Sequence, residues 1–173
     1  MQTILEIIGS TIIGGMLLLL IMTSKTNVSK SSNSQLINSN IQSNLTAVTE
    51  ILEADIKNLG YRITDSTDIT TADSNRITFK MLNDATHTTD SISYYYIASD
   101  TSLYRKVNNN TPGKITLGIT NFNVWYYDKN GAITTSKPII KSFKIAIIVQ
   151  DTFKYDGDPV SAYWVKTFKP QNL

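Results

Sequence analysis

Few residues of this chain have types and spacings that would support catalysis or metal binding. The 173 residues include no cysteine and one histidine, His87, which excludes a cysteine nucleophile, thiolate sites and multi-histidine zinc sites. A serine–histidine–aspartate triad would depend on His87, which stands among threonines and aspartates typical of a solvated loop. The carboxylates are scattered over predicted turns. We therefore expect a protein that is not an enzyme and that uses no cofactor and no metal.

Two acidic turns deserve comparison with calcium-binding loops. Asp128-Lys-Asn-Gly131 is not followed by a glutamate at the spacing that such a loop needs, so we interpret it as a hairpin turn. Asp156-Gly-Asp158 is likewise interpreted as a turn between strands. Neither segment predicts a metal site.

Glu6 is the most distinctive carboxylate, because it stands at the start of a long apolar segment. From Ile7 to Ser24 no residue is charged, and as a helix this segment would span roughly 27 Å, close to the hydrocarbon thickness of a bilayer. No Lys or Arg precedes Lys25, so the basic region of a signal peptide is missing. We predict a membrane-spanning helix over residues 1–24.

A carboxylate at the end of such a helix is costly unless it is hydrated, neutralised or paired. One interpretation of Glu6 is an interfacial residue in the first helical turn, where the helix dipole favours negative charge. The other is that Glu6 pairs with a cation of another chain, such as a neighbouring α-amino group. Lys25 and Lys30 after the segment weakly favour a cytoplasmic C-terminal part.

A second helical pattern follows the apolar segment. Apolar residues recur every three or four positions and form one stripe of an amphipathic helix. Gly60 then provides a residue suited to the left-handed conformation that ends helices. We predict that the helix continues over residues 25–60 and packs this stripe against the rest of the chain. The stripe consists of Ile37, Ile41, Leu45, Val48, Leu52, Ile56 and Leu59.

From residue 61 onwards the apolar pattern changes to a period of two, which is typical of strands. Turn residues separate the runs at 100–102, 108–113, 128–131 and 156–159. The sequence therefore predicts an α+β fold in which residues 61–173 form an antiparallel sheet that covers the helix stripe. The expected strands include Ile77–Met81, Ser91–Ile97, Leu103–Val107, Asn121–Tyr127, Ile139–Gln150 and Tyr163–Phe168.

Five short motifs lie in a characteristic order along the chain. They are Thr3–Glu6 before the apolar segment, Ile51–Arg62 with its Gly-Tyr pair, Tyr94–Ile97 leading to Leu103–Arg105, Phe122–Gly131, and the closing Thr167–Leu173. Their order and spacing resemble those of the type IV pilin family, in particular PilW/PulJ-like minor pilins and pseudopilins. The resemblance covers essentially the whole chain.

The resemblance implies a structural subunit of a type IV pilus or of a type II secretion pseudopilus. Such subunits are held in the bacterial inner membrane by the first helix, with the β domain outside the cytoplasm, and assembly machinery extracts them into helical filaments. Glu6 would pair with the terminal amine of an adjacent pilin or pseudopilin subunit, since two charges in an apolar bundle must neutralise each other. The implied assembly residues are Glu6, Ile7, Ile8, Ile12, Ile13, Gly14, Gly15, Leu17, Leu18 and Leu20.

The chain departs from the family pattern in ways that lead to further expectations. The family's glutamate is fifth in the mature chain, which Glu6 matches when Met1 is absent, and we expect a leader that was removed or is lacking. A missing leader would also explain why no cation precedes the apolar segment, so we discount the orientation that Lys25 and Lys30 weakly favour. No proline interrupts the helix near Met22, and Gly14-Gly15 would soften it instead. Two alternatives remain: a single-pass membrane-anchored binding protein that does not polymerise, and the major pilin of its filament.

Charge is distributed unevenly along the chain. Residues 31–100 contain 4 Lys and Arg against 9 Asp and Glu, whereas residues 101–173 contain 10 against 4. We interpret this asymmetry as a source of contacts between acidic and basic parts of neighbouring subunits. DNA or an anionic surface polymer is the less favoured partner of the basic part.

Overall fold

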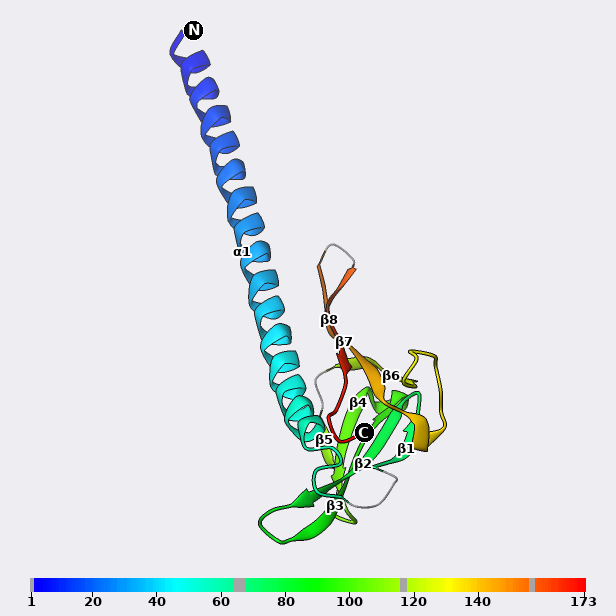
Figure 1. The fold of residues 1–173 in the computed structure, drawn as a ribbon. Helices are drawn as coiled ribbons and strands as arrows, with labels where there is room; N and C mark the ends of the chain where they lie inside the picture. The colour runs from blue at the N-terminus through cyan, green and yellow to red at the C-terminus, as the bar shows by residue number, and fades with distance from the viewer. Residues whose placement is uncertain (1, 64–67, 116–117, 156–157) are drawn as a thin grey trace. The chain divides into compact units, whose positions relative to one another are not determined.

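The computed structural model describes residues 2–63, 68–115, 118–155 and 158–173 (Figure 1). The chain divides into two units, residues 1–39 and residues 40–173, which are described separately. Within the described residues, one α-helix precedes an all-antiparallel β region, so the predicted α+β class with a long N-terminal helix is confirmed.

The helix α1 extends from Gln2 to Lys57 as one continuous element. Its last turn is followed by Gly60, which adopts a left-handed conformation with φ of 69°. The N–H of Gly60 donates to the carbonyl of Lys80, 2.9 Å away, and so joins the helix end to the sheet. The predicted glycine stop is thus present, three residues after the helix ends.

In the part of the chain that the structure describes, eight strands form two antiparallel sheets instead of the single sheet that we expected. Neighbouring strands follow one another in sequence within each sheet, as in a meander. The first sheet contains β1 (Ile69–Asp73), β2 (Arg76–Asn83), β3 (Thr88–Ile97), β4 (Ser102–Val107) and β5 (Gly113–Ile115). The second contains β6 (Ile119–Tyr127), β7 (Ser142–Tyr155) and β8 (Asp158–Phe168).

Some strand boundaries differ from the prediction. The strand expected from Ile139 begins only at Ser142, because Lys137–Ile139 forms a short 3₁₀-helix, η2, with Pro138 in its first turn. The turn expected at 100–102 begins earlier: a second 3₁₀-helix, η1, covers Ala98–Asp100, and Ser102 already begins β4. In the turn expected at 156–159, residues 156 and 157 lie outside the described residues, and Asp158 and Pro159 begin β8.

Two other predicted loops occur as expected. His87 is exposed in the turn between β2 and β3, with φ of 53°. Asp128 accepts hydrogen bonds from the N–H groups of Asn130 and Ala132 at 2.8 and 2.9 Å, and Gly131 has φ of 81°. Because that carboxylate oxygen is bound to backbone N–H groups, the segment forms the predicted tight turn.

The core of residues 40–173 lies between the helix stripe and one face of each sheet. Alternate residues of the central strands point inwards and are almost completely buried, whereas their neighbours face away from the core. Tyr126 of β6 joins the two sheets, because its hydroxyl donates to the carbonyl of Arg76 at 2.9 Å. Buried inward residues include Ile77, Phe79, Ile92, Tyr94, Leu103, Phe122, Val124, Phe143, Ile145 and Ile147.

Candidate assembly interface

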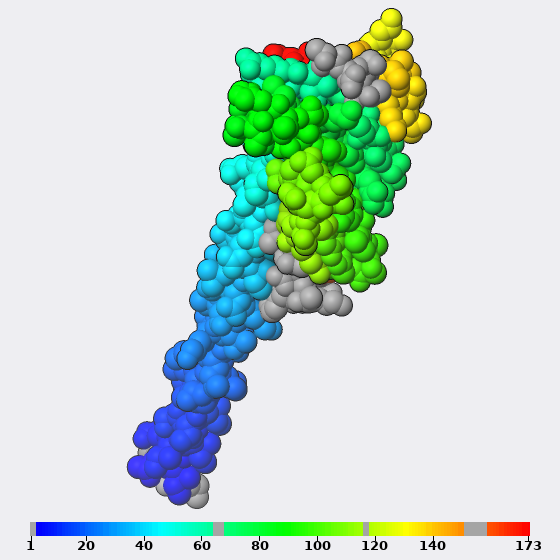
Figure 2. Space-filling view, turned by 90° about the horizontal axis from the view of Figure 1, so that it is seen from below, coloured from blue at the N-terminus to red at the C-terminus, as the bar shows by residue number. Residues whose placement is uncertain are grey.

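The first part of α1 exposes nearly all of its large apolar side chains. From Ile4 to Met22 these side chains are 50% to 69% exposed, and Figure 2 shows this segment in blue. The segment is long and apolar enough to cross a membrane. The structure places every predicted assembly residue on it: Glu6, Ile7, Ile8, Ile12, Ile13, Gly14, Gly15, Leu17, Leu18 and Leu20 are all exposed.

The polar side chains of this segment bond to the helix itself. The hydroxyls of Ser10 and Thr11 donate to the carbonyl of Ile7 at 2.9 Å, and Thr23 donates to Leu19 at 2.8 Å. These hydroxyl protons therefore need no water, which makes the segment compatible with lipid or with an apolar helix bundle. The apolar run in the sequence did not reveal this feature.

Glu6 presents an exposed carboxylate to a partner, whereas Gly14 and Gly15 present exposed backbone. Glu6 is exposed and forms no ion pair with any described residue. The helix begins at Gln2 and its first turn contains no acidic residue, so the interpretation of Glu6 as a first-turn residue is wrong. At Gly14 and Gly15 an added Cβ would meet no atom within 4 Å, so their backbone is open to close approach by a partner.

The second part of α1 buries its stripe within the domain formed by residues 40–173. Ile37, in the preceding unit, is half-buried, and Thr49 is a buried member of the stripe that the apolar pattern missed. Its hydroxyl donates to the carbonyl of Thr46 at 2.9 Å, which satisfies the polar group inside the core. The remaining predicted residues Ile41, Leu45, Val48, Leu52, Ile56 and Leu59 are 0% to 7% exposed.

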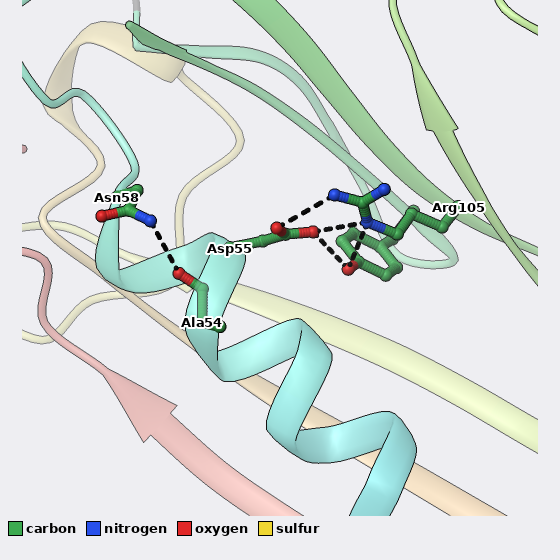
Figure 3. A network of polar contacts seen from close by, with 5 residues as sticks. Ala54, Asp55, Asn58 and Arg105 are labelled. Atoms are coloured by element: carbon green, nitrogen blue, oxygen red, sulfur yellow. Dashed lines mark hydrogen bonds and ion pairs between the residues drawn. The ribbon is translucent and has the colours of Figure 1, made fainter. Parts of the chain in front are cut away.

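A polar network fixes the sheet to the end of this helix (Figure 3). Arg105 of β4 donates through Nε and Nη2 to the two carboxylate oxygens of Asp55, at 2.7 and 3.1 Å. The Tyr94 hydroxyl of β3 donates to the same carboxylate at 2.5 Å. Asp55 belongs to the motif Ile51–Arg62, and Tyr94 and Arg105 belong to the motif that runs from Tyr94 to Arg105, so the fold brings two of the five motifs together.

The network pairs one carboxylate with one guanidinium beside the buried Tyr94 side chain, and Asp55 and Arg105 are partly buried. Burial raises the pKa of Tyr94, and the hydrogen bond to Asp55 raises that pKa further. The hydrogen bond to Asp55 also raises the pKa of the Arg105 guanidinium. Tyr94 therefore stays a neutral donor and Arg105 stays a cation, so the network acts as a structural clasp between helix and sheet.

Two further contacts attach β8 and the segment after it to α1 and to the residues that follow the helix. Lys166 of β8 forms an ion pair with Glu53 at 2.6 Å. Asn172 donates through its side-chain amide to the carbonyl of Leu59 at 3.0 Å. An added Cβ at Gly60 would lie 3.0 Å from the Cβ of Asn172, so this position favours glycine for close approach as well as for backbone conformation.

No family model matches this chain, and it has no significant match among curated proteins.

Proposed function

We propose that this chain is a structural subunit of a type IV pilus-like filament or type II secretion pseudopilus, and that it assembles through the first part of α1. The observation that supports this proposal is the uninterrupted exposure of apolar side chains from Ile4 to Met22. In water such a surface would associate non-specifically. It is compatible with a lipid bilayer before assembly and with a bundle of equivalent helices afterwards.

Glu6 has a specific role in this proposal. A carboxylate without a cationic partner on an apolar helix is costly in a bundle, and the α-amino group of an adjacent subunit would neutralise it. An incoming subunit displaced along the bundle would leave both charges unpaired. The pairing would therefore fix the axial register of each added subunit.

The proposal also implies a location and a set of partners. The chain resides in the bacterial inner membrane with its β domain outside the cytoplasm, until assembly machinery transfers it to a filament. Its partners in the filament are other pilin or pseudopilin subunits. The resemblance of its motifs to PilW/PulJ-like proteins favours a minor pilin or pseudopilin over the major subunit.

Glu6→Ala tests this function, with Glu50→Ala as a control that removes another exposed carboxylate, from the second part of the helix. Filaments sheared from producing cells and washed membranes are quantified separately by mass spectrometry. We expect wild type and Glu50→Ala in both fractions. Glu6→Ala should remain in the membranes and fall at least about tenfold in the sheared fraction, which corresponds to 1.4 kcal/mol of lost association.

Two results would overturn the proposal. Recovery of Glu6→Ala in sheared filaments at the wild-type level would remove the assembly role of the glutamate. Complete retention of the wild-type chain in membranes, while other pilins shear off, would contradict a surface pilus subunit. If that chain also failed to cross-link to other pilins or pseudopilins, a membrane-anchored binding protein would replace the filament subunit.

A further inference from the structure

The outer face of the first sheet contains a polar pocket of about 300 Å³. Strand alternation creates it, because Ile77 and Ile92 point into the core while their neighbours point outwards. The pocket is formed by β2, β3 and the end of β4, all within residues 40–173. It is therefore separate from the proposed assembly helix.

The pairing of the strands places two cations on this face. Arg76 pairs with Tyr95, and Ser93 lies between Thr78 on one side and Lys106 on the other. Directly opposed residues share one face of a sheet, so these side chains surround a common space. Among the described residues, Arg76 and Lys106 form no ion pair, and no carboxylate lines the pocket.

Aromatic stacking holds the arginine in position. The Arg76 guanidinium lies 5.0 Å from the centre of the Tyr95 ring. On the neighbouring strand Tyr104 stacks with Tyr95 at 5.2 Å and an interplanar angle of 9°. Since β3 lies between β2 and β4, both faces of the Tyr95 ring are covered. A stacked guanidinium loses less conformational freedom when it binds a ligand. Because both faces of the Tyr95 ring are covered, the ring offers no surface on which a nucleotide base could stack.

Neutral donors and acceptors complete the pocket. The hydroxyls of Thr78 and Ser93 lie 2.9 Å apart, so one hydroxyl hydrogen is used between them and the other can be donated to a ligand. Asn108 is fixed at the pocket edge, because it accepts from the N–H of Ser91 and donates to Asp90. Ser91 adds a further hydroxyl to the lining.

We infer that this pocket binds one carboxylate-bearing sugar unit of an acidic glycan. Arg76 and Lys106 match the carboxylate, since charge-assisted hydrogen bonds from both cations would converge on it. The hydroxyls of Thr78, Ser91 and Ser93 match the sugar hydroxyls. The volume lies at the lower end of the range for small-molecule sites, which suits a single ring with its substituents.

The test measures binding of an α-1,4-linked galacturonic acid trimer to the full chain in detergent micelles by titration calorimetry. The neutral galactose trimer, inorganic sulfate and a single-stranded DNA oligonucleotide serve as comparison probes. The variants are Arg76→Gln, Lys106→Gln and Thr78→Val, with Lys169→Gln as a matched loss of one exposed cation outside the pocket. Circular dichroism melting establishes that each variant is folded.

We expect the galacturonate trimer to bind, and Arg76→Gln and Lys106→Gln each to weaken that binding about tenfold or more. Thr78→Val should weaken it about threefold, and Lys169→Gln should leave it unchanged. Equal losses in Lys169→Gln and Arg76→Gln would overturn the site, because diffuse charge would then explain binding. Equal affinity for sulfate or the neutral trimer, or tighter pocket-dependent binding of the DNA, would overturn the assignment to an acidic sugar.

Discussion

The two parts of α1 contain similar apolar residues and place them in opposite environments. Leu18 in the first part is 59% exposed, whereas Leu52 in the second part is 0% exposed. In the second part the apolar residues form one stripe and the opposite face is polar, whereas in the first part they surround the helix. The second part thus finds its partner within the chain, and the first part needs one from outside.

This difference separates folding from assembly. The buried stripe contributes to the stability of the domain formed by residues 40–173 through the hydrophobic effect. The exposed segment contributes nothing to that domain's core, and its apolar surface remains available for lipid or neighbouring helices. The same substitution in the two parts should therefore affect different measurements.

Leucine truncation in the two parts is the most direct comparison. Leu52→Ala should destabilise the domain by about 4 kcal/mol, because it removes a fully buried side chain and leaves a cavity. Leu18→Ala should change the free energy of unfolding by less than about 0.5 kcal/mol. Denaturant unfolding of the full chain in detergent measures both. Similar losses in the two variants would contradict the division of the helix.

A charge in the first part should affect the membrane instead of the fold. Leu18→Asp places a carboxylate near the middle of the apolar segment, at an insertion cost of about 3 kcal/mol. We expect a large loss of this variant from carbonate-washed membranes, while the thermal unfolding of its domain is unchanged. Asn44→Asp adds the same charge at an exposed position of the second part and should remain in the membranes.

The clasp between helix and sheet can be opened at its carboxylate. Asp55→Asn removes the charge that binds Arg105 and keeps a similar shape, so we expect the domain to lose about 2 kcal/mol. Chemical denaturation provides the value. Arg105→Met tests the same contact from the sheet, and the double variant should lose less than the sum of the two single losses. Full additivity would show that the two residues are not coupled.

Alkaline pH should destabilise the domain formed by residues 40–173 through two buried tyrosines, Tyr94 of β3 and Tyr126 of β6. Burial raises the pKa of both Tyr94 and Tyr126 above their ordinary value of 10.0. The unfolded chain therefore loses these protons first, so their contribution is complete below about pH 10 and decreases at higher pH. The expected slope is about 1.4 kcal/mol per pH unit for each tyrosine. Tyr94→Phe and Tyr126→Phe should each remove one tyrosine's contribution to the slope of unfolding free energy against pH. An unchanged slope in both variants would contradict this assignment.

Elements with strong local signals were predictable from the sequence. The stripe spacing and Gly60 indicated the helix and its stop, and the β-branched and aromatic runs indicated β2, β3, β4, β6, β7 and β8. β1 and β5 were missed because Ile69–Asp73 and Gly113–Ile115 are short and form strands by pairing with β2 and β4. The division into two sheets was also missed, because strand pairing is a long-range property.

Functional residues were likewise predictable only where their signal is local in the sequence. Glu6 and the apolar run were visible because they are consecutive in sequence. The Asp55–Arg105 contact joins residues 50 positions apart, and no local pattern indicates it. The pocket on the first sheet had a weaker sequence signal, namely the polar residues at the outward positions of β2 and β3. That these polar residues share a pocket with Lys106 follows only from the register between β3 and β4, which pairs Lys106 with Ser93.

The bond between Asn172 and Leu59 has a mechanical consequence. The chain enters its β domain after Leu59 and returns to the same carbonyl at Asn172, near its C-terminus. Tension applied through α1 is therefore shared between the covalent connection at Gly60 and the returning end of the chain. The ion pair between Lys166 of β8 and Glu53 of α1 provides a second attachment. A domain attached to the helix region at Gly60, at Lys166 and at Asn172 in this way resists being separated from its helix one strand at a time.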